Sequence, residues 1–424
     1  MADTRTRDRF IPFRKKDIIA MCCDDSRMQA GDREAFRELC RILEALFHFE
    51  FHRRLEAIKN CYAPFNPDAD TRLVGGYTSE ERKRLQKELV SEMTAVLNSA
   101  NFEKITSEDL SQALTEESLF KIRLQVDFGD FEEVIFFRRG ESVRQETLVS
   151  FWGLKKKSFK FTNYDRVVIY LKFKEYAYFE SQARKNLNFI PGSTIIKLFH
   201  NVPKADLEML FPNSRVRMKT IDKLIIGVPA VVSGIVVVVT KLGASLILIA
   251  SVVAFWLGFR REEARLNQHH IIALGVGLAT LGGFLFRQIT KYKNRKIKFM
   301  KALSDNLYFK NLDNNTGVFY HLIDAAEEEE TKEVILAYFF LLTEKQPFTK
   351  KELDERIEKW FESGWNTRIN FEIDDALAKL DRLGLANTRD GERLQCQPLK
   401  EAKRRLDDIW DNYFRFNQPD SAST

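Results

Sequence analysis

Two histidines in the first part of the chain have a spacing that could serve metal chemistry. His48 and His52 lie one helical turn apart, and Glu44 lies one turn before them. Residues three or four apart share one face of a helix, so these side chains could converge on one ion. The sequence supplies no convincing further ligand. Packing on an aromatic-rich helix is therefore the favoured interpretation.

A second polar group stands later in the chain. His321, Asp324 and Glu328 fall at helical spacing, which can bind iron or manganese when a second helix supplies matching ligands. No such helix is evident in the sequence. We expect the acidic run 324–330 to be a solvated face, or a face that docks on a basic layer. The residues best placed for an interaction or an unidentified site are Asn311, Asp313, Asn314, Asn315, Asp324, Glu327 and Glu328.

The remaining chemical motifs are weak. Asp127-Phe128-Gly129 has the order of a kinase metal-binding tripeptide, but no glycine-rich loop or catalytic loop accompanies it, so a hairpin turn is favoured. The five cysteines lack metal-ligand spacing and are expected to be reduced thiols. We assign no catalytic residue, no metal and no cofactor, and an enzyme is less expected than a scaffold or regulatory protein.

The elements that must carry these residues are organised around one apolar stretch. The run 242–259 has 18 residues without a charge, and the run 271–286 has 16. As helices they would extend roughly 27 Å and 24 Å, close to the thickness of a bilayer core. We predict two spanning helices, at about 242–260 and 270–288, with 224–240 as an interfacial or re-entrant piece. Three crossings are the alternative.

Each proposed spanning helix carries a small residue at every fourth position. Such faces let helix backbones approach closely in lipid, although glycine and alanine are also common in such helices without that role. The predicted packing residues are Ala250, Ala254 and Gly258 on one helix, and Gly275, Ala279 and Gly283 on the other.

Basic residues flank the apolar stretch on both sides, which favours two crossings with both termini in the cytoplasm. The first residues have no apolar signal-peptide core, and two aspartates argue against a transit peptide. We therefore predict a bacterial-type inner membrane, with an organellar inner membrane as the alternative.

The basic charge is concentrated before the apolar stretch. Residues 151–223 hold fifteen Lys or Arg and six Asp or Glu, with aromatic residues between them. Such a layer suits anionic lipid headgroups, and Lys155, Lys156 and Lys157 are the predicted lipid-surface residues. A solvated sheet face and, less so, nucleic-acid contact are the alternatives.

The rest of the chain divides by its periodicity. Helical spacing marks 1–115 as a helical region, and alternation from Phe120 to Phe128, with a turn and a return at Val134–Phe137, opens an antiparallel α+β domain over 116–220. The hairpin occupies 221–290. The region 291–416 ends with three helices, a β-hairpin and a closing helix, as in a winged helix, and 417–424 is expected to be a disordered tail. The third of those helices is acidic, so protein contact is favoured over base readout.

Three stretches resemble a known family: RFIPFRKKDI near the start, FHNVPKADLEMLFPNSRVRMK before the apolar stretch, and LYFKNLDNNTGVFYHLIDAAEEEETKEVILAYFFLL after it. They are similar to the uncharacterised membrane-protein family that includes the mitochondrial transmembrane protein 143. The resemblance implies an integral membrane protein with a domain of unknown function, and it supplies no catalytic residue to carry over.

The sequence thus predicts an α+β membrane protein with an N-terminal helical region, an antiparallel α+β domain, a transmembrane helical hairpin and a C-terminal helical domain resembling a winged helix. A membrane-anchored scaffold or regulatory protein is the favoured function. The alternatives are a membrane-associated enzyme and a small oligomeric channel or transporter. The expected partners are a bilayer with anionic headgroups and a protein partner or a second copy, whereas nucleic acid is not expected.

Overall fold

The computed structural model describes residues 7–72, 74–106, 108–110, 123–150, 155–184, 187–217, 228, 231–236, 238–259, 268–344, 347–389 and 393–414. Its contacts divide the chain into two compact units. Unit 1 comprises Met1–Glu116, Phe128–Leu207 and Lys310–Thr424, and unit 2 comprises Glu117–Asp127 and Glu208–Phe309. The predicted division into four regions and a tail stays a prediction.

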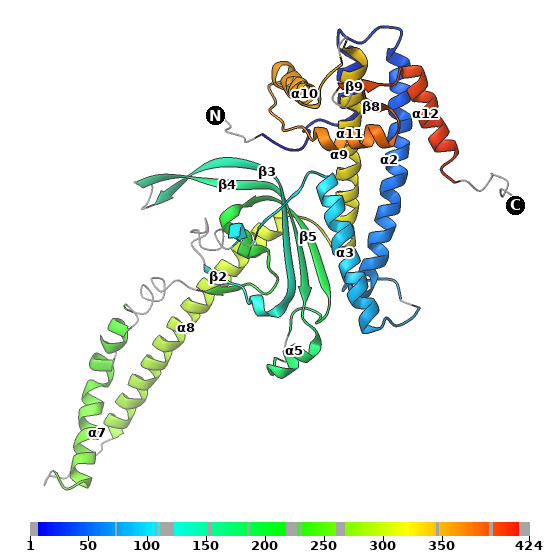
Figure 1. The fold of residues 1–424 in the computed structure, drawn as a ribbon. Coiled ribbons are helices and arrows are strands. Elements are labelled where there is room, and N and C mark those ends of the chain that lie inside the picture. Colours follow the sequence, from blue (N-terminus) through cyan, green and yellow to red (C-terminus); the bar gives the residue numbers. More distant parts are fainter. Residues whose placement is uncertain are drawn as a thin grey trace. The chain divides into compact units, whose positions relative to one another are not determined.

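Three long helices form the body of unit 1: α2 (Arg33–Tyr62), α3 (Ser79–Ser99) and α9 (Thr316–Thr343). Figure 1 shows them side by side. α2 buries Phe36, Leu39 and Leu43 at helical spacing, which gives it one apolar face. α3 begins with a capping box between Thr78 and Glu81. From residue 329 to residue 340 every side chain of α9 is buried, so this helix is the axis of the unit.

A five-stranded antiparallel sheet completes the core of unit 1, with strand order β1-β3-β4-β5-β7. Alternate side chains of its long strands, such as Ile135, Tyr170 and Ile196, belong to the same apolar core as the three helices. The strands are β1 (Glu103–Lys104), β3 (Phe131–Ser150), β4 (Lys155–Phe173), β5 (Thr194–Pro203) and β7 (Asn311–Asn314).

The first and the last described segments of the chain both belong to unit 1. An extended segment leads into α1 (Lys15–Asp24). In this segment Asp8 forms a parallel β-bridge with Ile369. The last helices are α10 (Lys350–Trp365), α11 (Ile373–Arg382) and α12 (Leu399–Asp411), with a hairpin of β8 (Ala386–Arg389) and β9 (Arg393–Cys396) before α12. This is the order of helices and hairpin that the sequence predicts for the last ninety residues.

Short elements connect these parts. A single-turn helix, α5 (Tyr176–Ser181), follows β4. The tighter 3₁₀ turns are η1 (Ala63–Phe65), η2 (Phe128–Asp130) and η3 (Lys204–Leu210).

Unit 2 contains a small antiparallel pair and an apolar helical hairpin. β2 (Arg123–Gln125) pairs with β6 (Arg215–Arg217). A π-helical turn, η4 (Val238–Leu242), leads into α7 (Gly243–Trp256), and α8 (Gln268–Lys310) follows.

The structure contradicts the predicted spanning hairpin. Within the described residues, every helix is too short or too polar to cross a bilayer. α7 has 14 residues, which is roughly 21 Å of helix rather than the roughly 30 Å of a bilayer core. The apolar part of α8 is continuous with a basic half that includes Arg287, Lys291 and Lys298. The predictions built on spanning helices are therefore wrong as well: an integral membrane protein, an inner-membrane location and a membrane-anchored scaffold.

A second correction concerns the first predicted strand pair. β2 covers only Arg123–Gln125 and pairs with β6, not with the chain at Val134–Phe137. That stretch lies within β3, whose two edges near Phe137 are taken by β1 and β4. No edge of β3 is left there for a hairpin partner among the described strands.

Candidate functional site

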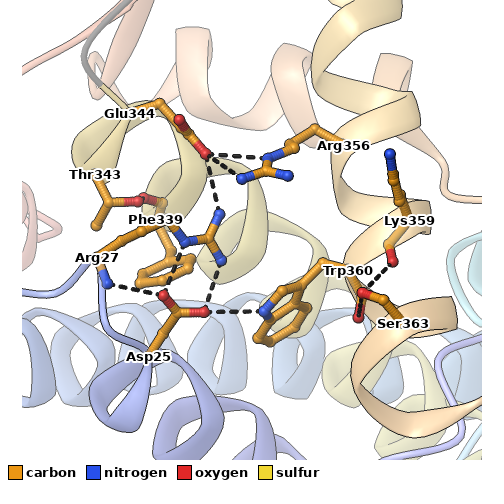
Figure 2. Close-up of polar contacts among 9 residues, drawn as sticks. All are labelled: Asp25, Arg27, Phe339, Thr343, Glu344, Arg356, Lys359, Trp360 and Ser363. Atoms are coloured by element: carbon orange, nitrogen blue, oxygen red, sulfur yellow. Dashed lines mark hydrogen bonds and ion pairs between the residues drawn. The ribbon is translucent and has the colours of Figure 1, made fainter.

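The candidate site begins at the end of α1, where the Asp25 carboxylate accepts hydrogen bonds from Arg27 and from Trp360 on α10. The Arg27 side chain donates to both of its oxygens, over 2.8 and 2.7 Å, and the Arg27 backbone N–H adds a third bond of 2.9 Å. The indole Nε1 of Trp360 on α10 donates over 3.0 Å (Figure 2). The hydrogen bonds from Arg27 are the main reason why the pKa of Asp25 is lowered from 3.8 to about 2. Asp25 is therefore a fixed carboxylate at neutral pH.

Arg27 shows how this region holds a guanidinium. Its Nη1 donates to Glu344 over 3.1 Å, and Glu344 also accepts from Nε of Arg356 over 3.1 Å (Figure 2). The guanidinium carbon lies 4.4 Å from the centre of the Phe340 ring and 5.2 Å from that of Phe339. The cation is thus enclosed by carboxylates at its edge and by aromatic rings at its face.

A surface pocket lies beside this network. It has a volume of about 500 Å³ and is lined by Phe13, Asp17, Ala20, Met21, Asp24, Asp25 and Trp365. Its aromatic wall is held in place, because the Trp365 ring lies 4.4 Å from that of Trp360 and 6.4 Å from that of Phe13. α10 ends at Trp365 because Asn366 takes the left-handed conformation, with φ of 50°.

The chemistry of this pocket suits a cation. Asp17 and Asp24 are exposed, and Asp25 is the fixed carboxylate at the inner edge. None of the described residues that line the pocket is basic, a histidine or a cysteine. The pocket therefore offers negative charge and aromatic faces, without a nucleophile of the serine or cysteine type.

A buried charged cluster lies within the same unit, on α9. Glu329, Glu330, Lys332 and Glu333 are each less than 5% exposed. Lys332 Nζ lies 2.9 Å from Glu329, and it also donates to the backbone oxygens of Ile11 over 2.7 Å and Phe13 over 3.1 Å. The expectation of a solvated acidic face is therefore wrong for this part of the run, because the N-terminal segment covers it.

A second group of carboxylates next to this cluster has a spacing that could suit a metal ion. Carboxylate oxygens of Glu330, Glu333 and Asp375 lie within 4.8 Å of one another, a grouping of oxygen ligands that could hold an ion. The ammonium of Lys379 on α11 pairs with all three: with Glu330 at close contact, Glu333 at 3.2 Å and Asp375 at 2.7 Å. Burial raises the pKa of Glu333 and lowers that of Lys379 to about 7. Because an ammonium already lies among the carboxylates, we interpret this group as structural.

The predicted polar turn lies at the start of α9 and fastens it to the sheet. Asn311, Asp313 and Asn314 belong to β7. Asn315 is buried, its backbone N–H donates to the Ile196 carbonyl over 2.6 Å, and its Oδ1 accepts from the Ile196 N–H over 3.1 Å. These contacts indicate a structural part for Asn315, while an interaction through its neighbours stays a prediction.

The predicted residues farther along α9 are divided among different neighbours. Asp324 is exposed, whereas Glu327 lies 2.9 Å from the ammonium of Lys15 and 2.9 Å from Nδ1 of His48. Glu328 accepts from the Lys15 backbone N–H over 3.2 Å. His321 pairs instead with Asp313, at 3.2 Å. His48 of the first motif therefore meets Glu327 of the acidic run, which their separation in the sequence concealed.

The remaining predicted residues stay predictions. Lys155, Lys156 and Lys157 begin β4, and their side chains lie outside the described residues. Of the predicted packing residues, Ala254 is half-buried and Ala250 and Ala279 are exposed. Gly258, Gly275 and Gly283 have open space around them in the described part of the chain.

Sequence reasoning missed the acidic and aromatic pocket. Its residues come from segments more than 300 positions apart, so no local pattern could join them. Two signals were available: the pair Asp24-Asp25 directly after the apolar run 18–23, and the two tryptophans Trp360 and Trp365, five positions apart.

Comparison with known proteins identifies one domain. A family described as "Protein of unknown function (DUF3754)" matches residues 164–317, which run from within β4 to the start of α9. The pocket and the buried charged cluster lie outside this stretch. No solved structure matches the chain.

Proposed function

We propose that this chain is a binding protein that holds a basic segment of a protein partner on the surface formed by α1 and α10. The pocket of three aspartates and two aromatic rings carries this proposal. Charge complementarity of this kind selects partners and speeds their encounter. It also agrees with the acidic third helix near the end of the chain, which favours protein contact over base readout.

The chain itself supports the proposal, because the same body already holds one extended basic segment. Arg7 pairs with Glu358 on α10 at 2.9 Å, and Arg9 pairs with Glu372 at 2.6 Å. The backbone of Asp8 accepts from the Asn370 N–H over 2.9 Å. Carboxylates of α10 and of the turn before α11 thus recognise arginines of an extended strand.

The test is a titration of the full chain with a labelled basic peptide, followed by fluorescence anisotropy. We expect binding that weakens as salt rises, and a loss of at least tenfold in the variant Asp17→Asn/Asp24→Asn. Asp407→Asn on α12 is the matched control, because it removes one exposed carboxylate far along the chain. Equal binding by the double variant, or by an acidic peptide, would contradict the proposal.

A relationship of the chain to a particular protein family is also a proposal. We infer from residues 9–18, 199–219 and 307–342 that the chain is related to the family that includes the mitochondrial transmembrane protein 143. The stretch 199–219 lies wholly inside the matched domain, and the stretch 307–342 lies partly inside it. A structure of a member with a strand order other than β1-β3-β4-β5-β7 would count against it.

A further inference from the structure

We propose that the pocket lined by Phe13, Asp17, Asp24 and Trp365 receives the guanidinium of an arginine side chain. This inference rests on the proposed function and names the group by which the partner is recognised. The pocket has about 500 Å³, within the usual range for sites that take small groups. An arginine side chain from an extended segment would enter it with its charged end inward.

Arg27 provides the internal precedent for this recognition. Its guanidinium contacts the carboxylates of Asp25 and Glu344 and lies 4.4 Å from the centre of the Phe340 ring, and the pocket offers the same kinds of group. Both sites share Asp25, whose two oxygens already accept from Arg27 and Trp360 (Figure 2). The charge of Asp25 is therefore already paired with Arg27, and Asp17 and Asp24 are the carboxylates left to accept from a new cation.

The geometry favours guanidinium over the other cations of proteins. A guanidinium is flat, lies against aromatic faces and donates five N–H bonds, so it can lie against Trp365 and donate to an aspartate at the same time. A lysine ammonium is a compact charge that is more strongly hydrated, and a trimethylated ammonium has no N–H to donate to a carboxylate. Hydrogen bonds to the aspartates at the rim therefore favour a guanidinium over a lysine ammonium or a trimethylated ammonium.

The direct test uses the full chain and a peptide series that differs at one position: arginine, lysine, trimethyl-lysine or citrulline. Citrulline keeps the shape of arginine and lacks its charge. We expect the arginine peptide to bind at least tenfold more tightly than the citrulline peptide, and several-fold more tightly than the lysine and trimethyl-lysine peptides. Isothermal titration calorimetry gives the affinities, and the tryptophan fluorescence gives a second readout.

Variants of the pocket locate the binding. Asp17→Asn/Asp24→Asn should remove most of the preference for arginine over citrulline, and Trp365→Leu should weaken arginine binding while Trp365→Phe retains it. Asp17 and Asp24 are exposed, so the double variant is expected to keep its fold, which circular dichroism checks. Asp407→Asn is again the control.

The outcomes separate the two proposals. If no basic peptide binds, the proposed function is wrong. If all basic peptides bind equally and lose affinity equally in the aspartate variant, the proposed function stands and the inference about guanidinium is overturned. Equal affinity for arginine and citrulline, or tighter binding of trimethyl-lysine, also overturns it.

Discussion

Asp25 illustrates how one residue can serve both the fold and the candidate site. It joins the end of α1 to α10 through Trp360 and fixes Arg27 against two phenylalanine rings. Its side chain is only 12% exposed, so its hydrogen bonds lie in a region of low dielectric constant. A carboxylate in this position stabilises the protein only while it is ionised.

The pH dependence of this contribution can be predicted. Because the pKa of Asp25 is lowered from 3.8 to about 2, its stabilising effect is complete above about pH 4 and is lost as pH falls toward 2. We expect Asp25→Asn to lower the free energy of unfolding by about 2 kcal/mol at pH 7. The difference between wild type and variant should shrink markedly at pH 2, in urea unfolding followed by fluorescence. A difference that is the same at both pH values would show that the ionised form is not the cause.

Lys379 is the second residue whose substitution should lower the free energy of unfolding. We expect Lys379→Met to lower the free energy of unfolding by about 3–5 kcal/mol, because Glu330 and Glu333 would lose their buried ammonium. Adding Glu333→Gln should recover part of this loss, since it removes one uncompensated charge. A double-mutant cycle in urea measures the coupling. Lys351→Met, at an 86% exposed side chain, is the control, and strictly additive losses would refute the coupling.

At the scale of elements, α9 is a helix whose middle holds charges in the core of the unit. Glu329 and Lys332 occupy the place where the N-terminal segment crosses the helix, and the Ile11 N–H donates to Glu329 over 2.9 Å. Such groups are stable in a core because each has a partner. The hydrogen bonds of Glu329 and Lys332 therefore fix the position of the N-terminal segment on α9. Apolar contacts alone have no such directional preference.

This fastening predicts the effect of a single substitution. Lys332→Met removes the donor to the carbonyls of Ile11 and Phe13, so residues 8–14 should open more readily. We expect the Ile11 amide to exchange its hydrogen at least tenfold faster in the variant, measured by mass spectrometry or NMR. Lys16→Met, at an exposed position, should leave the rate unchanged. Unaltered exchange at Ile11 in Lys332→Met would show that apolar contacts alone hold the segment.

Periodicity and capping residues were enough to predict several elements. The order of three helices, a hairpin and a closing helix near the end of the chain was predicted, and α9 to α12 follow it. The capping boxes that begin α3 and α10, at Thr78 and Thr349, are further signals of this kind. These signals are local, so one sequence reveals them.

The errors arose where distant residues decide the outcome. The run 242–259 is apolar, but α7 covers only part of it, after a π-helical turn. Glu330 and Glu333 look like surface residues, and they are buried because Lys379 and the rest of the unit compensate their charges. The pocket also escaped prediction, since Phe13 and Trp365 meet only in the folded chain.

The whole molecule contains two units, and the main apolar core belongs to unit 1 alone. Every residue of that core lies in Met1–Glu116, Phe128–Leu207 or Lys310–Thr424. The larger segment of unit 2, Glu208–Phe309, follows β5 and precedes β7. These two strands pair with each other: Lys197 lies opposite Asn314, and Leu198 lies opposite Asp313. The long segment between them is thus inserted between two paired strands.

This arrangement predicts that unit 1 folds without the insertion. Replacing residues 208–309 by a flexible linker of about ten residues would still reach from β5 to β7, because an extended chain spans about 3.3–3.6 Å per residue. We expect the shortened protein to unfold in one cooperative urea transition and to keep its near-ultraviolet circular dichroism. A broad transition, or a lost near-ultraviolet signal, would show that the core of unit 1 depends on unit 2.

The contact between Ile11 and Glu329 also bears on how the protein is made. The two residues are 318 positions apart in the chain, so a ribosome that adds about 5–20 residues each second needs roughly 16–64 s to pass from one to the other. During that time the extended segment that contains Ile11 has been synthesised, while the helix that secures it does not yet exist. The segment that contains Ile11 therefore becomes ordered only after α9 has been made, and the apolar face of α2 stays uncovered by α9 until then.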